Sequence, residues 1–237
     1  LDLRLGDIAY RVRASFLTGR NRTVTERLQD FTMHTVPLTG GAVLEKGCVY
    51  VVPLLERLDL PAGMTAAASA KSSIGRLDLL TRIITDRGDA FDRVPDGYTG
   101  PLFVEICPRS FSVVAQPGQM LNQIIFRQGQ TLMSDAELLA LHQQTPIVNT
   151  PPEISDGLGF SVDLRPAQGT LIGYRAKPHT GVVDLSKIAH YTPADYWEEV
   201  HTRPLYTYDS PDATRRGARG RIRYNKKITV PAPYSRT

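Results

Sequence analysis

The chain has 237 residues, 41% of them hydrophobic and 22% charged, which is enough for one or two packed domains. It contains no run of 18 apolar residues, so a transmembrane helix is excluded. The two cysteines have no CxxC spacing and no apolar leader opens the chain, so we expect a reducing, cytoplasmic setting.

Short strands separated by turns are expected through the first half of the chain. β-branched or aromatic runs predict strands at residues 49–52, 79–84, 102–106 and 123–126. Turn-forming residues punctuate them at Pro53 and at residues 61–63, 95–97 and 117–118. This spacing predicts an all-β barrel or sandwich with few short helices.

One helix is predicted at residues 135–142, because Ser134 can cap it and Glu137 lies three positions later. A Thr-Pro-Pro linker at residues 150–152 follows. Beyond it, residues 160–165 and 173–175 repeat the pattern of residues 1–4 and 10–11, which favours a duplication. We therefore expect a barrel domain (1–133), a helix and linker (134–152), a partial second repeat (153–202) and an extension (203–237).

The net charge of +4 is concentrated in that extension. Residues 203–237 hold nine Arg or Lys against two acids, a balance of +7, so residues 1–202 carry about −3. The extension could hold a triphosphate, touch RNA or simply be solvated, and charge runs are usually solvated.

Two neighbouring segments carry the chemistry. Residues 71–77 read Lys-Ser-Ser-Ile-Gly-Arg-Leu, and residues 97–105 read Gly-Tyr-Thr-Gly-Pro-Leu-Phe-Val-Glu. Hydroxyls and a guanidinium can bind a phosphate or a base edge, and a carboxylate on an apolar strand can activate water. Together they suggest a nucleotide hydrolase.

These segments resemble the dCTP deaminase family of the trimeric dUTPase-like superfamily, in its two-domain bacterial form. Residues 1–6 resemble its opening strand, 97–100 its substrate hairpin, and 117–124 its closing hairpin. The resemblance covers roughly residues 1–130 and implies a dUTPase-like distorted β-barrel or jelly roll (β-clip). The second repeat lacks its own Ser-Ser-x-Gly-Arg element and strand glutamate, so we expect it to be structural or incomplete.

A zinc deaminase is not expected, because the cysteines lie 59 positions apart and none of the five histidines is in an H-x-E motif. The candidate base is Glu105. Strand alternation places it on one face with Phe103 and Cys107, where apolar neighbours suit proton transfer. Spacing alone favours a solvent-facing glutamate instead; the resemblance favours the catalytic role.

By resemblance, Ser72 helps Glu105 to fix the attacking water, and Arg76 stabilises the oxygen that develops at C4 of cytosine. Lys71 and Ser73 are expected along the phosphates. Ser72 and Ser73 could equally cap a short helix, and both roles are compatible.

Further substrate contacts are expected from the hairpins. The family's Asp-Pro-Gly is replaced by Pro95-Asp96-Gly97, after what resembles a small insertion at residues 85–93. Asp96 is thus a candidate partner for the sugar 3′-hydroxyl, and Tyr98 either contacts substrate or packs the hairpin. Gln119 and Gln123 could read the pyrimidine or phosphates, or serve as turn and surface residues.

The resemblance implies hydrolytic deamination of dCTP to dUTP and ammonia, with Mg²⁺ arriving on the triphosphate and no zinc. It also implies a homotrimer with sites at subunit interfaces, and neither a membrane nor nucleic acid as partner. One alternative is a bifunctional deaminase and dUTP diphosphatase that yields dUMP. Another is a non-catalytic nucleotide- or nucleic-acid-binding protein whose basic extension is the active part.

Overall fold

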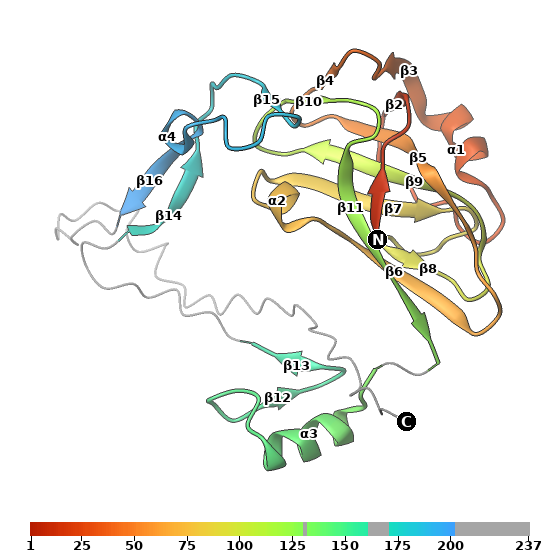
Figure 1. Ribbon diagram of the computed structural model, residues 1–237, viewed down its shortest axis with the longest axis vertical. Coiled ribbons are helices and arrows are strands. Elements are labelled where there is room, and N and C mark those ends of the chain that lie inside the picture. Colours follow the sequence, from red (N-terminus) through yellow and green to blue (C-terminus); the bar gives the residue numbers. More distant parts are fainter. Residues whose placement is uncertain (130–131, 161–170, 202–237) are drawn as a thin grey trace, which may run out of the picture. The chain divides into compact units, whose positions relative to one another are not determined.

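The computed structural model of the chain describes residues 1–129, 132–160 and 171–201 (Figure 1). It divides into one unit of residues 1–129 and 176–198 and a second of residues 130–175 and 199–237. Residues 161–165 of the expected repeat, and residues 203–237 of the basic extension, lie outside the described residues. Within the described part, no helix is long and apolar enough to cross a membrane.

The larger sheet of the first unit has five antiparallel strands in the order β3-β2-β5-β9-β7. Their bounds are Thr32–Pro37 (β3), Ile8–Val12 (β2), Val49–Asp59 (β5), Thr99–Pro108 (β9) and Leu79–Thr85 (β7). Three of the four predicted strands fall in β5, β7 and β9 and are confirmed. β9 has a hydrogen-bonded neighbour on each side and is buried almost throughout, and apart from Glu105 the buried side chains of both its faces are apolar.

Two smaller sheets complete this unit. The four-stranded sheet has the order β1-β11-β6-β8, and the three-stranded sheet the order β15-β10-β4. Their bounds are Asp2–Arg4 (β1), Met120–Gln128 (β11), Met64–Ala70 (β6), Arg93–Val94 (β8), Val183–Asp184 (β15), Val113–Ala115 (β10) and Ala42–Leu44 (β4). The predicted strand at residues 123–126 lies in β11 and is confirmed.

The main core lies between the five-stranded and four-stranded sheets. Leu102, Val104 and Ile106 enter it from β9, and Leu3 and Ile124 from the opposite sheet. Phe103 points the other way, into a second cluster on the outer face of the five-stranded sheet. That cluster is closed by residues of the segment before α1 and of α1 itself (Val24–Phe31): Phe16, Val24 and Leu28. The expected all-β architecture is confirmed, and both faces of β9 are covered.

Pro53 does not end its strand as the sequence suggested. β5 continues through it to Asp59, and the pairing with β9 is irregular between Pro53 and Arg57. A proline has no N–H for the ladder, so a strand can carry it at such an irregularity. The other predicted turns are confirmed at residues 61–63, 95–97 and 117–118, each with a glycine at positive φ.

Short elements complete the described chain. They are α2 (Ser72–Gly75), α3 (Asp135–Gln144), β12 (Glu153–Ile154), β13 (Leu158–Gly159), β14 (Leu171–Ala176), α4 (Pro193–Tyr196) and β16 (Trp197–His201). α3 confirms the predicted helix, because the Ser134 hydroxyl accepts from the Glu137 N–H while the Glu137 carboxylate accepts from the Ser134 N–H. β12 pairs with β13, and β14 with β16.

Candidate active site

Glu105 is buried on the outer face of the five-stranded sheet. Its partners in the sheet are Val51 on β5 and Arg82 on β7, and its side chain is 1% exposed. The predicted face shared with Phe103 is confirmed, and the alternative of a solvent-facing glutamate is wrong. Phe16 and residues of α1 pack over this face, while Arg82 beside Glu105 remains 29% exposed.

Arg82 forms an ion pair with this carboxylate. Arg82 Nε and Nη2 both donate to Glu105 Oε1, at 3.1 and 2.5 Å. Arg82 Nη2 also donates to Ser15 Oγ at 3.0 Å, and the guanidinium carbon lies 3.7 Å from the centre of the Phe91 ring. Glu105 Oε2 is buried and has no hydrogen-bond partner among the residues the structure describes. The two oxygens of one carboxylate therefore have different environments.

The loop between β7 and β8, residues 86–92, borders this ion pair. Besides Phe91 it supplies Asp92, whose Oδ1 accepts from the Ile83 N–H at 2.8 Å. Burial raises the pKa of Asp92, and the hydrogen bond from Ile83 and the charge of Arg82 oppose that rise only in part. In the sequence these residues resemble only a small insertion. Phe91 followed by an aspartate is the signal that could have drawn attention to them.

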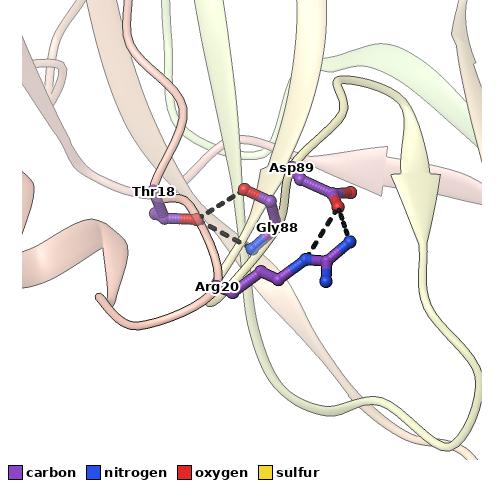
Figure 2. Close-up of polar contacts among 4 residues, drawn as sticks. All are labelled: Thr18, Arg20, Gly88 and Asp89. Carbon is purple, nitrogen blue, oxygen red and sulfur yellow. Dashed lines mark hydrogen bonds and ion pairs between the residues drawn. The ribbon is translucent and has the colours of Figure 1, made fainter.

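Hydrogen bonds fasten this loop to the segment before α1 (Figure 2). The Thr18 hydroxyl accepts from the Gly88 N–H at 2.8 Å and lies 3.0 Å from the carbonyl oxygens of Thr85 and Gly88, to which it can donate. Arg20 and Asp89 form a second link at 3.3 Å, but their side chains are 85% and 65% exposed. The buried Thr18 contact is thus the stronger candidate for holding the loop in place.

The Ser-Ser-x-Gly-Arg segment lies elsewhere. Ser72, Ser73 and Arg76 are exposed, and Ile74 anchors α2 in the main core. Neither serine caps the helix, because α2 begins at Ser72 and its N-cap position is Lys71, whose side chain makes no cap bond. Three exposed polar side chains around one buried anchor leave this segment free to bind a ligand from outside.

Lys71 and Gln123 are brought together on the outer face of the four-stranded sheet. Gln123 lies between Asp2 on β1 and Ser69 on β6, and its Nε2 donates to Ser69 Oγ at 3.4 Å. Lys71 Nζ forms an ion pair with Asp2 at 2.7 Å. These two predicted substrate-binding residues therefore share one exposed polar surface.

The remaining predicted contacts have structural partners. Asp96 Oδ1 accepts from the Gly63 N–H at 2.6 Å, and Gln119 Oε1 accepts from the Gln116 N–H at 3.0 Å. Tyr98 is buried; its hydroxyl donates to the Pro101 carbonyl at 2.6 Å and accepts from the Asp86 N–H at 3.1 Å. Of its two expected roles, Tyr98 has the packing contacts.

Tyr98 also explains a glycine in the hairpin at residues 97–100. A Cβ on Gly100 would lie 2.6 Å from the Tyr98 hydroxyl oxygen, so any larger residue would collide with the buried ring. Hairpin packing thus accounts for Gly100 opposite Tyr98, whatever else the hairpin does.

Within one chain the predicted site residues form two groups separated by the core. Lys71 and Gln123 lie on the outer side of the four-stranded sheet, whereas Glu105 lies on the outer side of the five-stranded sheet. Packed sheets lie about 10 Å apart, so both sheets separate the two groups. A single chain does not bring Glu105 to the polar surface of Lys71.

Comparison with known proteins identifies the family. Residues 1–130 match the family model of the 2'-deoxycytidine 5'-triphosphate deaminase (DCD) N-terminal domain, and residues 134–209 match that of the DCD C-terminal domain. The chain belongs to the dCTP deaminase family. The expected resemblance to this family is confirmed, and the fold matches that of a solved dCTP deaminase.

Two relatives show how far the likeness extends. The crystal structure of 2'-deoxycytidine 5'-triphosphate deaminase from Agrobacterium tumefaciens is 49% identical, with a TM-score of 0.74 over 86% of this chain and 62% of that one. A dCTP deaminase of Halorubrum lacusprofundi is 26% identical over 128 residues, which are 53% of this chain and 60% of the relative. The chain spans about three fifths of the length of each.

Proposed function

We propose that this protein hydrolyses the 4-amino group of dCTP to give dUTP and ammonia, with Glu105 as the group that transfers protons. Membership of the dCTP deaminase family supports the substrate. The observation that carries the role of Glu105 is its buried Oε2, which has no partner among the described residues while Oε1 is held by Arg82. A carboxylate oxygen left without a donor in a covered site is available to accept a proton.

The chemistry needs one water and no net proton. As the water oxygen bonds to C4 of cytosine, Glu105 takes a proton from it and delivers that proton to N3. Glu105 then takes the remaining hydroxyl proton and passes it to the amino nitrogen as the C4–N bond breaks, which releases ammonia and restores the carboxylate. Arg76 is proposed to stabilise the oxygen at C4, with Ser72 orienting the water.

We further propose that each site is shared between two chains, as in a trimer. The separation of Lys71 and Gln123 from Glu105 by the core of one chain supports this arrangement. A second chain could place its exposed Ser72, Ser73 and Arg76 against the outer face that carries Glu105. Mg²⁺ would accompany the triphosphate, and no zinc is required at the base.

Glu105→Gln tests the chemistry. The purified protein is incubated with dCTP and Mg²⁺, with and without a zinc-selective chelator, while ammonia is followed and dCTP, dUTP and dUMP are separated. We expect chelator-resistant dUTP, and a loss of rate on the order of 10²- to 10⁴-fold in the variant. Glu56→Gln is the matched control, because Glu56 is a β5 glutamate that pairs with Arg4.

Wild-type protein without dCTP turnover, or an active Glu105→Gln variant, would contradict this proposal. Accumulation of dUMP would assign the bifunctional reaction instead.

The shared site has its own test. If two chains build it, mixed oligomers of Arg76→Ala and Glu105→Gln regain activity that neither variant has alone.

A further inference from the structure

Arg82 is held on three sides. Its guanidinium donates to Glu105 Oε1 and to Ser15 Oγ, and its flat face lies against the Phe91 ring. A planar fork that is stacked and hydrogen-bonded at once has little freedom to turn. Arg82 therefore fixes the carboxylate in one orientation rather than only balancing its charge.

That orientation distinguishes the two oxygens of Glu105. Both Arg82 donors go to Oε1, and none goes to Oε2. Two donors on Oε1 stabilise negative charge there and occupy the positions from which a proton could reach it. Oε2 is left as the carboxylate oxygen that has no donor among the described residues.

We propose that Arg82 is a positioning residue that makes Oε2 the only proton-transfer atom of Glu105, an inference that rests on the deamination proposed above. Oε2 accepts the proton of the attacking water, delivers it to N3 of cytosine, then accepts the second proton and delivers it to the leaving amino group. Oε1 stays bonded to Arg82 throughout, so the carboxylate does not rotate between the two transfers.

Loss of this fixed orientation should lower kcat and leave KM nearly unchanged. Arg82 bonds to the glutamate and Ser15, so substrate affinity does not depend on it directly. A misplacement of a reacting group by about 1 Å can lower the rate on the order of 10²-fold. We expect Arg82→Ala to lower kcat by roughly that factor, with the KM for dCTP within about twofold of wild type.

The experiment compares Arg82→Ala and Arg82→Lys with Arg20→Ala as the matched control. Arg20 pairs with Asp89 of the neighbouring loop in an exposed salt bridge, so its removal should leave both constants unchanged. Guanidinium chloride at sub-denaturing concentration should restore part of the activity of Arg82→Ala, because free guanidinium can occupy the site beside Oε1. Arg82→Lys keeps the charge without the planar fork, so its kcat should lie between those of the wild type and Arg82→Ala.

The possible results distinguish a failure of the positioning role of Arg82 from a failure of the proposed deamination. Absence of dCTP turnover in the wild type overturns both. Wild-type turnover with unchanged kcat in either Arg82 variant overturns the positioning role alone, as does a raised KM at unchanged kcat. Loss of rate without rescue by guanidinium, in a variant that melts at the wild-type temperature, also overturns it. If Arg82→Ala does not fold, the kcat of Arg82→Lys decides.

Discussion

The buried hydroxyl of Thr18 is expected to fasten the loop that borders the Glu105 pair, and Thr18→Val tests it. Thr18 is 3% exposed, and valine has nearly the same shape without the hydroxyl. The substitution removes the acceptor of the Gly88 N–H and the donor to the Gly88 carbonyl (Figure 2). It also removes the donor to the Thr85 carbonyl. Packing is kept, so any loss of stability comes from the hydrogen bonds.

The expected loss can be estimated from those bonds. A buried N–H left without a partner costs about 1–3 kcal/mol, and the lost hydroxyl donation adds about 1 kcal/mol. Thr18→Val should therefore lower the free energy of unfolding by about 2–4 kcal/mol. The measurement is equilibrium unfolding in urea, where the midpoint should fall while the slope stays constant.

Two controls sharpen this prediction. Thr18→Ser keeps the hydroxyl and loses one methyl group, which should cost about 1 kcal/mol. Arg20→Ala removes only the exposed link to Asp89 and should change stability by less than about 0.5 kcal/mol. If Thr18→Val is no less stable than Thr18→Ser, the hydroxyl does not hold the loop and the argument is refuted.

Two further variants test buried polar groups nearby. Burial raises the pKa of Asp92, so its stabilising contribution is full below about pH 4 and is lost as pH rises through the folded-state pKa. Asp92→Asn keeps the acceptor for the Ile83 N–H and tolerates the positive φ. Its melting temperature should rise relative to that of the wild type between about pH 4 and pH 7. A difference in melting temperature that stays constant with pH would contradict this. Tyr98→Phe leaves the Asp86 N–H and the Pro101 carbonyl without their partner, and should cost about 1–3 kcal/mol in urea unfolding. An unchanged midpoint would show that these groups find other partners.

The strands could be predicted because their sequences are locally consistent. The β-branched runs end at turns with proline and glycine, and the glycines of these turns have positive φ in the structure. The capping box at Ser134 marks the start of α3. Pro53 is the exception. Whether this proline ends the strand depends on the irregular pairing of β5 with β9. The register of that pairing cannot be predicted from the sequence of one strand.

The environment of Glu105 was predictable only in part. Alternation along β9 gives its face, and that face is correct. Arg82 and Glu105 are 23 positions apart in sequence, and they form an ion pair only because β7 pairs with β9 in one particular register. Phe91 stacks on Arg82 only because of the fold of a loop that resembles a plain insertion in the sequence. Long-range contacts of this kind depend on tertiary structure, so Arg82 and Phe91 were missed.

The separation of the two groups of site residues has a cause in the local sequence. Ile74 is the apolar residue of its segment, and its burial in the main core turns Ser72, Ser73 and Arg76 outward. Glu105 alternates with Val104 and Ile106, which enter that same core from β9, so it must face away from it. The same core thus directs both polar groups outward on different sides. This separation within one chain supports the proposal that a substrate is bound between two chains.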